Sequence, residues 1–151
     1  MDLLVNALVS IILAATPLLL AAEGELVAER AGVLNLGVEG MMLTGAIAGF
    51  AAALATGSAA LGAGAGLLAG VALSSVFAVL TLTLHANQTA TGLALTIFGR
   101  GFSALAGAGF VGMPAPTLPK LHLPVLSGLP VAGPVLFQHD ALVYAALALL
   151  A

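Results

Sequence analysis

Residues 29–42 read Glu29-Arg30-Ala31-Gly32-Val33-Leu34-Asn35-Leu36-Gly37-Val38-Glu39-Gly40-Met41-Met42, which sets charged, amide and glycine residues directly against long apolar runs. In water this stretch would be an ordinary loop. In a bilayer each charge and each unpaired backbone group is costly, so a stretch of this kind beside membrane segments indicates a function rather than a structural need. The composition of the chain indicates whether this stretch lies among water-soluble or membrane-embedded segments.

Hydrophobic residues make up 62% of the 151-residue chain and charged residues 6%, against roughly 45–50% and about 25% in soluble domains. The sequence therefore predicts a membrane protein, with the lipid bilayer as a partner. Three basic side chains and a net charge of −3 cannot supply the several phosphate contacts of nucleic-acid binding, so nucleic acid is excluded as a partner. The absence of cysteine excludes disulfides, thiolate metal sites and cysteine nucleophiles.

Two apolar runs, 3–22 and 59–84, carry no charge and are long enough to cross a bilayer as helices. Pro17 is expected to kink the first helix rather than end it, because apolar residues continue on both sides. A cleaved signal peptide is the alternative for this run. That alternative requires a basic start, whereas Met1-Asp2 is acidic.

The run 41–56 is too short to span the hydrocarbon core alone, so residues before it must also lie in the membrane. We expect non-helical backbone over 35–40, in a broken or re-entrant segment that faces protein or a cavity. Asn35 and Glu39 would then lie beside a transport path. The alternative is a tight interfacial turn with Glu39 at the lipid headgroups.

A second polar stretch, 85–92, precedes the apolar run 93–107, which contains Arg100. Either Arg100 snorkels to an interface or this segment is also re-entrant. Asn87 and Gln88 either line a polar path or satisfy a helix end. The sequence leaves both choices open.

Small residues recur at intervals of four in the second and third apolar runs, which puts them on one face of each helix. Such stripes let helix backbones approach closely, and this is how membrane helices gain van der Waals contact. We therefore predict a compact bundle. The predicted packing glycines are Gly45, Gly49, Gly62, Gly66 and Gly70.

Residues 108–140 contain six of the seven prolines, so regular long helix is excluded there. We expect an irregular surface loop with short amphipathic turns around 121–126. The last run, 141–151, stops while still apolar, so the chain is expected to be an N-terminal fragment of a longer protein. The predicted fold class is an all-α, polytopic transmembrane helical bundle with broken or re-entrant segments.

Catalytic motifs are missing. There is no Gly-x-Ser-x-Gly or His-Glu-x-x-His, and the histidines at 85, 122 and 139 lack metal-ligand spacing, so no catalytic residue, metal or other cofactor is expected. Lys120 follows a proline, so no phosphate-binding loop can be written. Any ATP used must be bound by a partner. Asp140 is expected to cap the last helix.

The segment 29–46 resembles the signature of the permease subunits of bacterial ABC importers in the broad branched-chain amino acid, ribose and simple-sugar group. It reads Glu-Arg-x-Gly-Val-Leu-Asn-Leu-Gly-Val-Glu-Gly-Met-Met-Leu-x-Gly-Ala and is most similar to the nucleoside or simple-sugar branch. The segments 86–95 and 123–137 carry further matches. Thr96 and Arg100 depart from the pattern expected of the family.

The resemblance implies that residues 1–151 form one transmembrane permease domain of a multi-pass protein in the cell (plasma or inner) membrane, truncated at its C-terminus. It implies a second permease subunit, a cytoplasmic ATP-binding cassette ATPase and an extracytoplasmic solute-binding protein, which together import a nucleoside or simple sugar. The substrate-path candidates are Asn35, Glu39, Asn87 and Gln88. The rival hypothesis is a secondary transporter or channel subunit that uses Glu39 as an ion or proton site.

Overall fold

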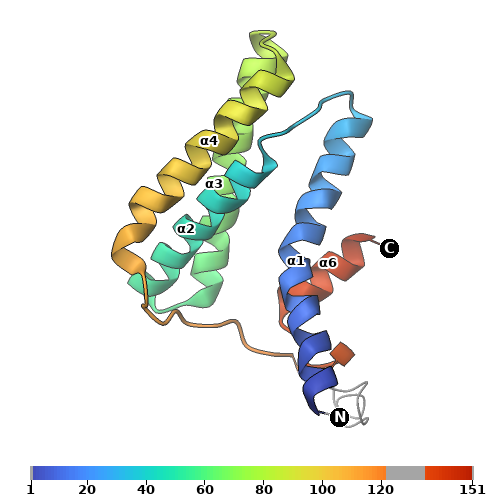
Figure 1. Ribbon diagram of the computed structural model, residues 1–151, viewed down its shortest axis with the longest axis vertical. Coiled ribbons are helices and arrows are strands. Elements are labelled where there is room, and N and C mark those ends of the chain that lie inside the picture. The colour runs from blue at the N-terminus through green and yellow to red at the C-terminus, as the bar shows by residue number, and fades with distance from the viewer. Residues whose placement is uncertain (1, 122–134, 151) are drawn as a thin grey trace. The chain divides into compact units, whose positions relative to one another are not determined.

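The computed structural model describes residues 2–121 and 135–150, and every regular element within them is a helix (Figure 1). Contacts divide the chain into two compact parts, one of residues 1–24 and 118–151 and the other of residues 25–117. The α-helices are α1 (Asp2–Arg30), α2 (Val38–Thr56), α3 (Ala59–Ala78), α4 (Gln88–Gly107) and α6 (Ala141–Leu150). A π-helical turn, Val79–Thr83, extends α3, and a 3₁₀ turn, Ala108–Phe110, extends α4.

Four helical segments are long and apolar enough to cross a membrane. Their lengths range from 19 to 28 residues, and about 20 are needed to span the hydrocarbon core. The predicted all-α, polytopic class is therefore confirmed. The four segments are Leu3–Arg30, Val38–Thr56, Ala59–Thr83 and Gln88–Phe110.

The first helix continues beyond the predicted run 3–22 to Arg30, with Pro17 inside it. Six of the eight added residues are Glu, Leu, Ala or Arg, all strong helix formers. Gly32, at φ +81°, ends the helix, because the N–H of Gly32 bonds Glu29 O and the N–H of Val33 reaches back to Ala28 O. This is a Schellman cap, which requires the left-handed conformation that glycine adopts without strain.

The predicted break is present but displaced toward the N-terminus. Irregular backbone covers 31–37 instead of 35–40, and Glu39 lies in the first turn of α2. A carboxylate is favoured there, because the free N–H groups of a helix start carry partial positive charge. The break follows the Schellman cap rather than the glycines at 37 and 40.

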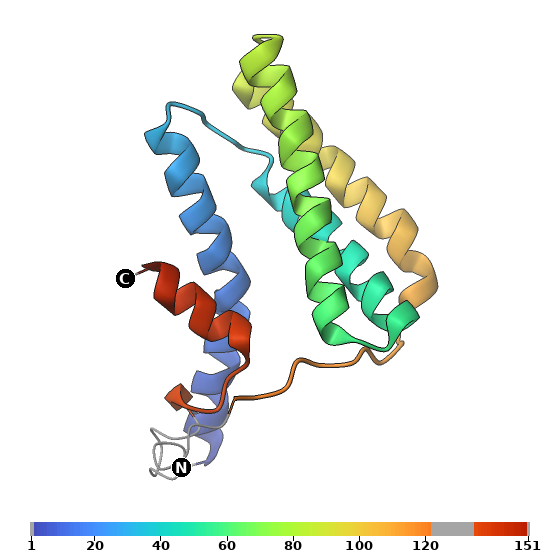
Figure 2. The same cartoon turned by 180° about the vertical axis from the view of Figure 1, so that it is seen from behind.

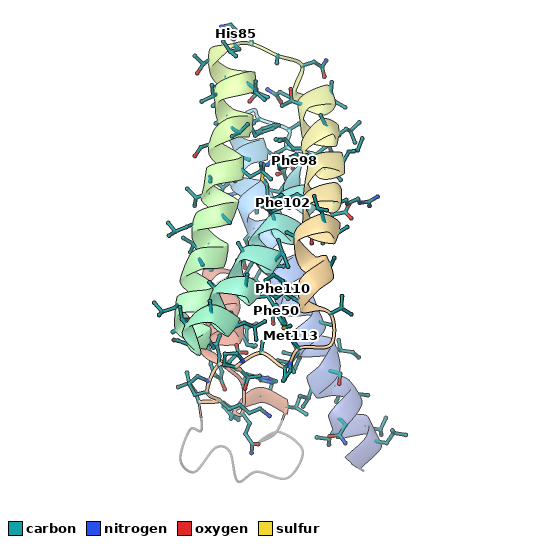
Figure 3. All side chains as sticks on the ribbon, turned by 90° about the vertical axis from the view of Figure 1, so that its left-hand side faces the viewer. Phe50, His85, Phe98, Phe102, Phe110 and Met113 are labelled. Carbon is teal, nitrogen blue, oxygen red and sulfur yellow. The ribbon has the colours of Figure 1, made fainter. Side chains whose placement is uncertain are left out.

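The second predicted break is shorter than expected. α4 begins at Gln88 and continues through Arg100, so the re-entrant alternative for this segment is wrong. Only the turn between Leu84 and Asn87 separates it from the preceding helix, with His85 at φ 54°. Figure 3 shows His85 at one end of this helix pair and, at the other end, Phe50 and Phe110, whose rings meet edge to face at 6.1 Å.

Helix α2 packs along both α3 and α4 (Figures 1 and 2). The buried cluster at these contacts consists of Met41, Leu73, Phe77 and Leu95, with Val33 packed against it. Large apolar side chains elsewhere on the three helices remain exposed, including Leu67, Leu68 and Leu105. Apolar side chains on the outside suit a protein whose solvent is lipid.

Glycines carry the crossing of α2 and α3. A Cβ built on Gly45 would lie 3.0 Å from Gly66 O, and one built on Gly49 would lie 3.0 Å from Gly62 O. The structure therefore brings four of the five predicted packing glycines together in two pairs. The fifth, Gly70, differs, because a Cβ there meets nothing within 4 Å in the described parts of the chain.

We expect Gly66→Leu to lower the stability of the full-length protein by about 1–3 kcal/mol, because the side chain would force two touching backbones apart. Gly70→Leu, on the same helix, is the matched control and should change stability little. Thermal unfolding in detergent, followed by the loss of the monodisperse species, measures both. An equal loss at the two positions would contradict this packing.

In the other part of the chain, Asp140 begins α6. Its Oδ1 accepts from the N–H groups of Leu142 at 3.0 Å and Val143 at 3.1 Å, which confirms the predicted cap. Residues 111–121 of the proline-rich loop are irregular, as predicted. The amphipathic turns expected around 121–126 and the motif 123–137 lie mostly outside the described residues.

Candidate functional site

Most N–H groups of the backbone between α1 and α2 are hydrogen-bonded. Those of residues 31–33 donate to the last carbonyls of α1. The N–H of Leu34 donates to Gln88 Oε1 at 2.7 Å, and the N–H of Asn35 to Glu25 Oε1 at 2.8 Å. Unpaired backbone groups at membrane depth cost several kcal/mol each, so irregular backbone there needs partners of this kind.

The side chain of Asn35 prepares the start of α2. Its Oδ1 accepts from the N–H of Gly37 at 2.9 Å, and its Nδ2 lies 3.4 Å from the sulfur of Met41. A side-chain oxygen that accepts from the backbone two residues later forms an Asx turn, which holds the chain in a fixed bend. The Asn35 side chain therefore stabilises the backbone of the segment to which it belongs.

One side of α4 holds this segment in place. Besides the Gln88 bond to Leu34, Thr96 Oγ1 donates to Leu36 O at 2.9 Å. Gly92 lets the backbones meet, because a Cβ on it would lie 2.8 Å from the nitrogen of Leu36. The irregular segment thus lies between the candidate spans Leu3–Arg30 and Val38–Thr56 and against the first half of α4. The broken segment at membrane depth stays a prediction, with the interfacial turn as its alternative.

Further along α4 than Gly92, the first turn of α2 crosses α4 at a second close contact, between Gly40 and Gly99. A Cβ on Gly40 would overlap the backbone of Leu95, and a Cβ on Gly99 would overlap the backbone of Gly40. Both glycines are buried. No side chain fits at either position, so this contact fixes the depth at which α2 begins relative to α4.

Beside this crossing, Glu39 and Arg100 form an ion pair. Arg100 Nη2 lies 2.7 Å and Nε 3.1 Å from Glu39 Oε1. The two side chains are 54% and 63% exposed within the described chain. The pair has no net charge, and it joins the first turn of α2 to α4.

The four substrate-path candidates have different local roles. Asn87 caps α4, because its Oδ1 accepts from the N–H of Ala90 at 2.9 Å. Asn35 and Gln88 bond backbone groups of the irregular segment. Glu39 alone of the four pairs with a charged side chain. Three are therefore engaged in holding local backbone, and Asn87 fits the helix-end alternative.

Sequence reasoning missed Glu25, Thr96 and Arg100 as members of this site. Arg100 had a usable signal, since an arginine and a carboxylate that both fall among apolar runs are expected to neutralise each other. The two residues noted as departures from the family pattern, Thr96 and Arg100, are the ones whose side chains contact the α2 start. Glu25 gave no such signal, because its Oε1 accepts from a backbone N–H, the N–H of Asn35, and not from another side chain.

Chemically, the site offers amides, a hydroxyl and a balanced ion pair. No group of three or more His, Cys, Asp or Glu side chains that could hold a metal occurs in residues 2–121 and 135–150. The amide and hydroxyl groups of the site are types that form hydrogen bonds to neutral polar molecules.

Comparisons with known proteins agree with these features. Residues 7–151 match the family described as branched-chain amino acid transport system / permease component. A putative glucose ABC transporter permease protein of Haloferax volcanii is 45% identical over 148 residues, which cover 95% of this chain and 44% of the relative. A guanosine ABC transporter permease protein of Bacillus subtilis is 30% identical over 136 residues, covering 82% of this chain and 42% of the relative.

A nucleoside ABC transporter permease protein of Lactococcus lactis is 29% identical over 137 residues, or 84% of this chain and 43% of the relative. The chain thus spans less than half the length of these curated relatives. No solved structure matches it. The family match and the four long apolar helices make it a multi-pass protein of the cell membrane. The chain belongs to the permease-component family of the branched-chain amino acid transport systems.

Proposed function

We propose that this chain is part of the permease subunit of an ATP-driven ABC importer that carries a nucleoside or a simple sugar into the cell. The main support for the proposal is the start of α2. The irregular backbone before it has the N–H groups of residues 31–35 and 37 bonded, lies against the first half of a candidate membrane-spanning helix, and has an ion pair beside it. Broken helices of this kind occur in transporters where the backbone lines a route for the solute.

The named relatives support the choice of solute. Their names specify glucose, guanosine and nucleoside, and all of these are hydroxyl-rich molecules. Polar groups that donate and accept hydrogen bonds suit such solutes. A site that binds them moderately also lets them leave, which a transport route requires.

The permease contributes the wall of the route and no bond-breaking chemistry. In alternating access, the route opens to one side of the membrane at a time, and a ligand shifts the balance only if it binds the two states unequally. A partner ATP-binding cassette ATPase supplies that bias through ATP binding and hydrolysis. A second permease subunit completes the route, and an extracytoplasmic solute-binding protein delivers the solute.

The rival function is a secondary transporter in which Glu39 carries a proton or cation. The Glu39–Arg100 pair disfavours it, because the guanidinium of Arg100 already balances the charge of the Glu39 carboxylate. A carboxylate that takes up and releases a cation in every cycle would have to break this pair each time. The ABC hypothesis has no such requirement.

Uptake into proteoliposomes tests the proposal. The full-length permease, reconstituted with its ATPase and solute-binding protein, is expected to accumulate radiolabelled glucose or guanosine only when hydrolysable ATP is present on the ATPase side. Ionophores that collapse proton and sodium gradients should leave uptake unchanged. Uptake that needs a gradient and proceeds without ATP would establish the rival function.

A further inference from the structure

The Glu39–Arg100 pair has unused hydrogen-bonding groups. Both bonds from Arg100 end on the same carboxylate oxygen, Oε1. An arginine that serves only to brace a carboxylate commonly uses a two-pronged geometry, with one donor on each oxygen. Here Oε2 of Glu39 and Nη1 of Arg100 bond no group in the parts of the chain that the structure describes. One acceptor oxygen of the carboxylate and one donor nitrogen of the guanidinium are left over.

The position of the pair restricts what can cover these groups. Arg100 lies twelve residues after Gln88 and ten before Phe110, the two ends of the candidate span. At about 1.5 Å per residue, it is roughly 15 Å from the nearer end. An arginine at such depth does not face lipid without a large cost, and such residues face the bundle interior or a water-filled route. The exposed edge of the pair therefore faces protein or water.

We propose that this edge is a contact site for the solute, in which Glu39 Oε2 accepts a hydrogen bond from a solute hydroxyl and Arg100 Nη1 donates one. The inference rests on the proposed function and adds to it a residue pair that selects the solute. Each hydroxyl of a sugar or a ribose can both donate and accept, so neighbouring hydroxyls can serve both groups. Hydrogen bonds to charged groups are stronger than those between neutral groups, so this pair would give the contact its selectivity.

The charge balance sets the class of solute. An anion near Arg100 would also meet the carboxylate of Glu39, and a cation near Glu39 would meet the guanidinium. The pair therefore favours solutes without net charge over anions and cations. Asn35, Asn87 and Gln88 are engaged by backbone groups of this chain, whereas the ion pair is exposed and keeps an acceptor and a donor that are not used within the described residues.

Deoxy analogues provide the test. Uptake by the full-length complex is measured for glucose and its deoxy analogues, or for guanosine and its deoxyribose analogue, in the wild type and in Glu39→Gln and Arg100→Gln. We expect the wild type to discriminate against the analogue that lacks the contacted hydroxyl by about ten-fold to a hundred-fold in kcat/KM. In both variants this ratio should fall toward one, through a higher KM for the parent solute. Such coupling between a residue and a solute group is a double-mutant cycle.

Two controls separate solute contact from folding. Glu29→Gln, at an exposed position of α1, removes a carboxylate and should leave the discrimination unchanged. The exchange variant Glu39→Arg with Arg100→Glu keeps an ion pair but reverses its groups. Assembly is followed as ATP hydrolysis stimulated by the solute-binding protein. We expect the exchange variant to assemble and still to lose discrimination.

A purely structural pair gives a different result. All analogues would then lose uptake by the same factor in the single variants, and the exchange variant would restore both assembly and discrimination. Either result would overturn the solute contact while leaving the importer function intact. If the wild-type complex shows no ATP-dependent uptake of glucose or guanosine, the proposed function fails, and the assignment of the pair fails with it.

Discussion

Gly99→Leu is expected to prevent α2 and α4 from packing, whereas Gly101→Leu, two residues further along the same helix, should be tolerated. A Cβ on Gly99 would overlap backbone atoms of Gly40, and a Cβ on Gly101 meets nothing within 4 Å in the described chain. A neighbouring side chain can rotate away from an added methyl group, but backbone cannot. The cost should therefore exceed the roughly 1–3 kcal/mol typical of overpacking.

The full-length permease carrying a fluorescent tag allows the comparison. After detergent extraction, size-exclusion profiles report the fraction that is folded, and heating before chromatography gives the midpoint of unfolding. We expect little folded Gly99→Leu protein and a near wild-type midpoint for Gly101→Leu. Similar profiles for the two variants would mean that α2 does not cross α4 at Gly40.

The crossing of α2 and α4 shows which features of the fold can be predicted from the sequence and which cannot. The need for a break before the run 41–56 followed from its length, and the glycine stripe predicted that helices would meet closely. Neither pattern specifies which helix meets which. Gly40 and Gly99 were not predicted as packing residues, because they lack the four-residue spacing in their own helices and are paired only in space.

The displaced break has a similar explanation. Glycine permits a bend but does not require one, so glycines 37 and 40 did not locate it. The Schellman cap at Gly32 and the Asx turn of Asn35 located it, and both depend on hydrogen bonds between residues close in sequence. The 85–92 stretch was misjudged for the opposite reason: once Asn87 caps a helix, the polar residues after it fit in its first turn.

Polar residues near membrane segments are thus ambiguous in sequence, because one side chain can serve either a solute or a backbone group. Gln88 and Thr96 are separated from their backbone partners by 54 and 60 residues. No local spacing rule connects such pairs. The ion pair is different, because charge compensation is expected wherever two opposite charges lie among apolar residues.

Glu25→Leu is expected to loosen the segment 31–37, and Glu25→Gln is expected to leave it nearly intact. Oε1 of Glu25 accepts the N–H of Asn35 at 2.8 Å. Glutamine retains an acceptor oxygen at the same reach, whereas leucine leaves the N–H without a partner. An unsatisfied buried backbone group costs about 1–3 kcal/mol. We expect this cost to lower the stability of the segment 31–37 against local opening.

Hydrogen exchange of the amide of Asn35 in the full-length permease measures this effect. A loss of 1.4 kcal/mol corresponds to about ten-fold faster exchange through local opening. Glu29→Leu is the control, because it removes a carboxylate from the same helix at an exposed position that has no side-chain bond to the segment. If exchange accelerates equally in Glu25→Gln and Glu25→Leu, the charge of Glu25 rather than its acceptor oxygen holds the segment. The start of α2 would then depend on electrostatics in α1, and the hydrogen bond to Asn35 would be a consequence of that arrangement.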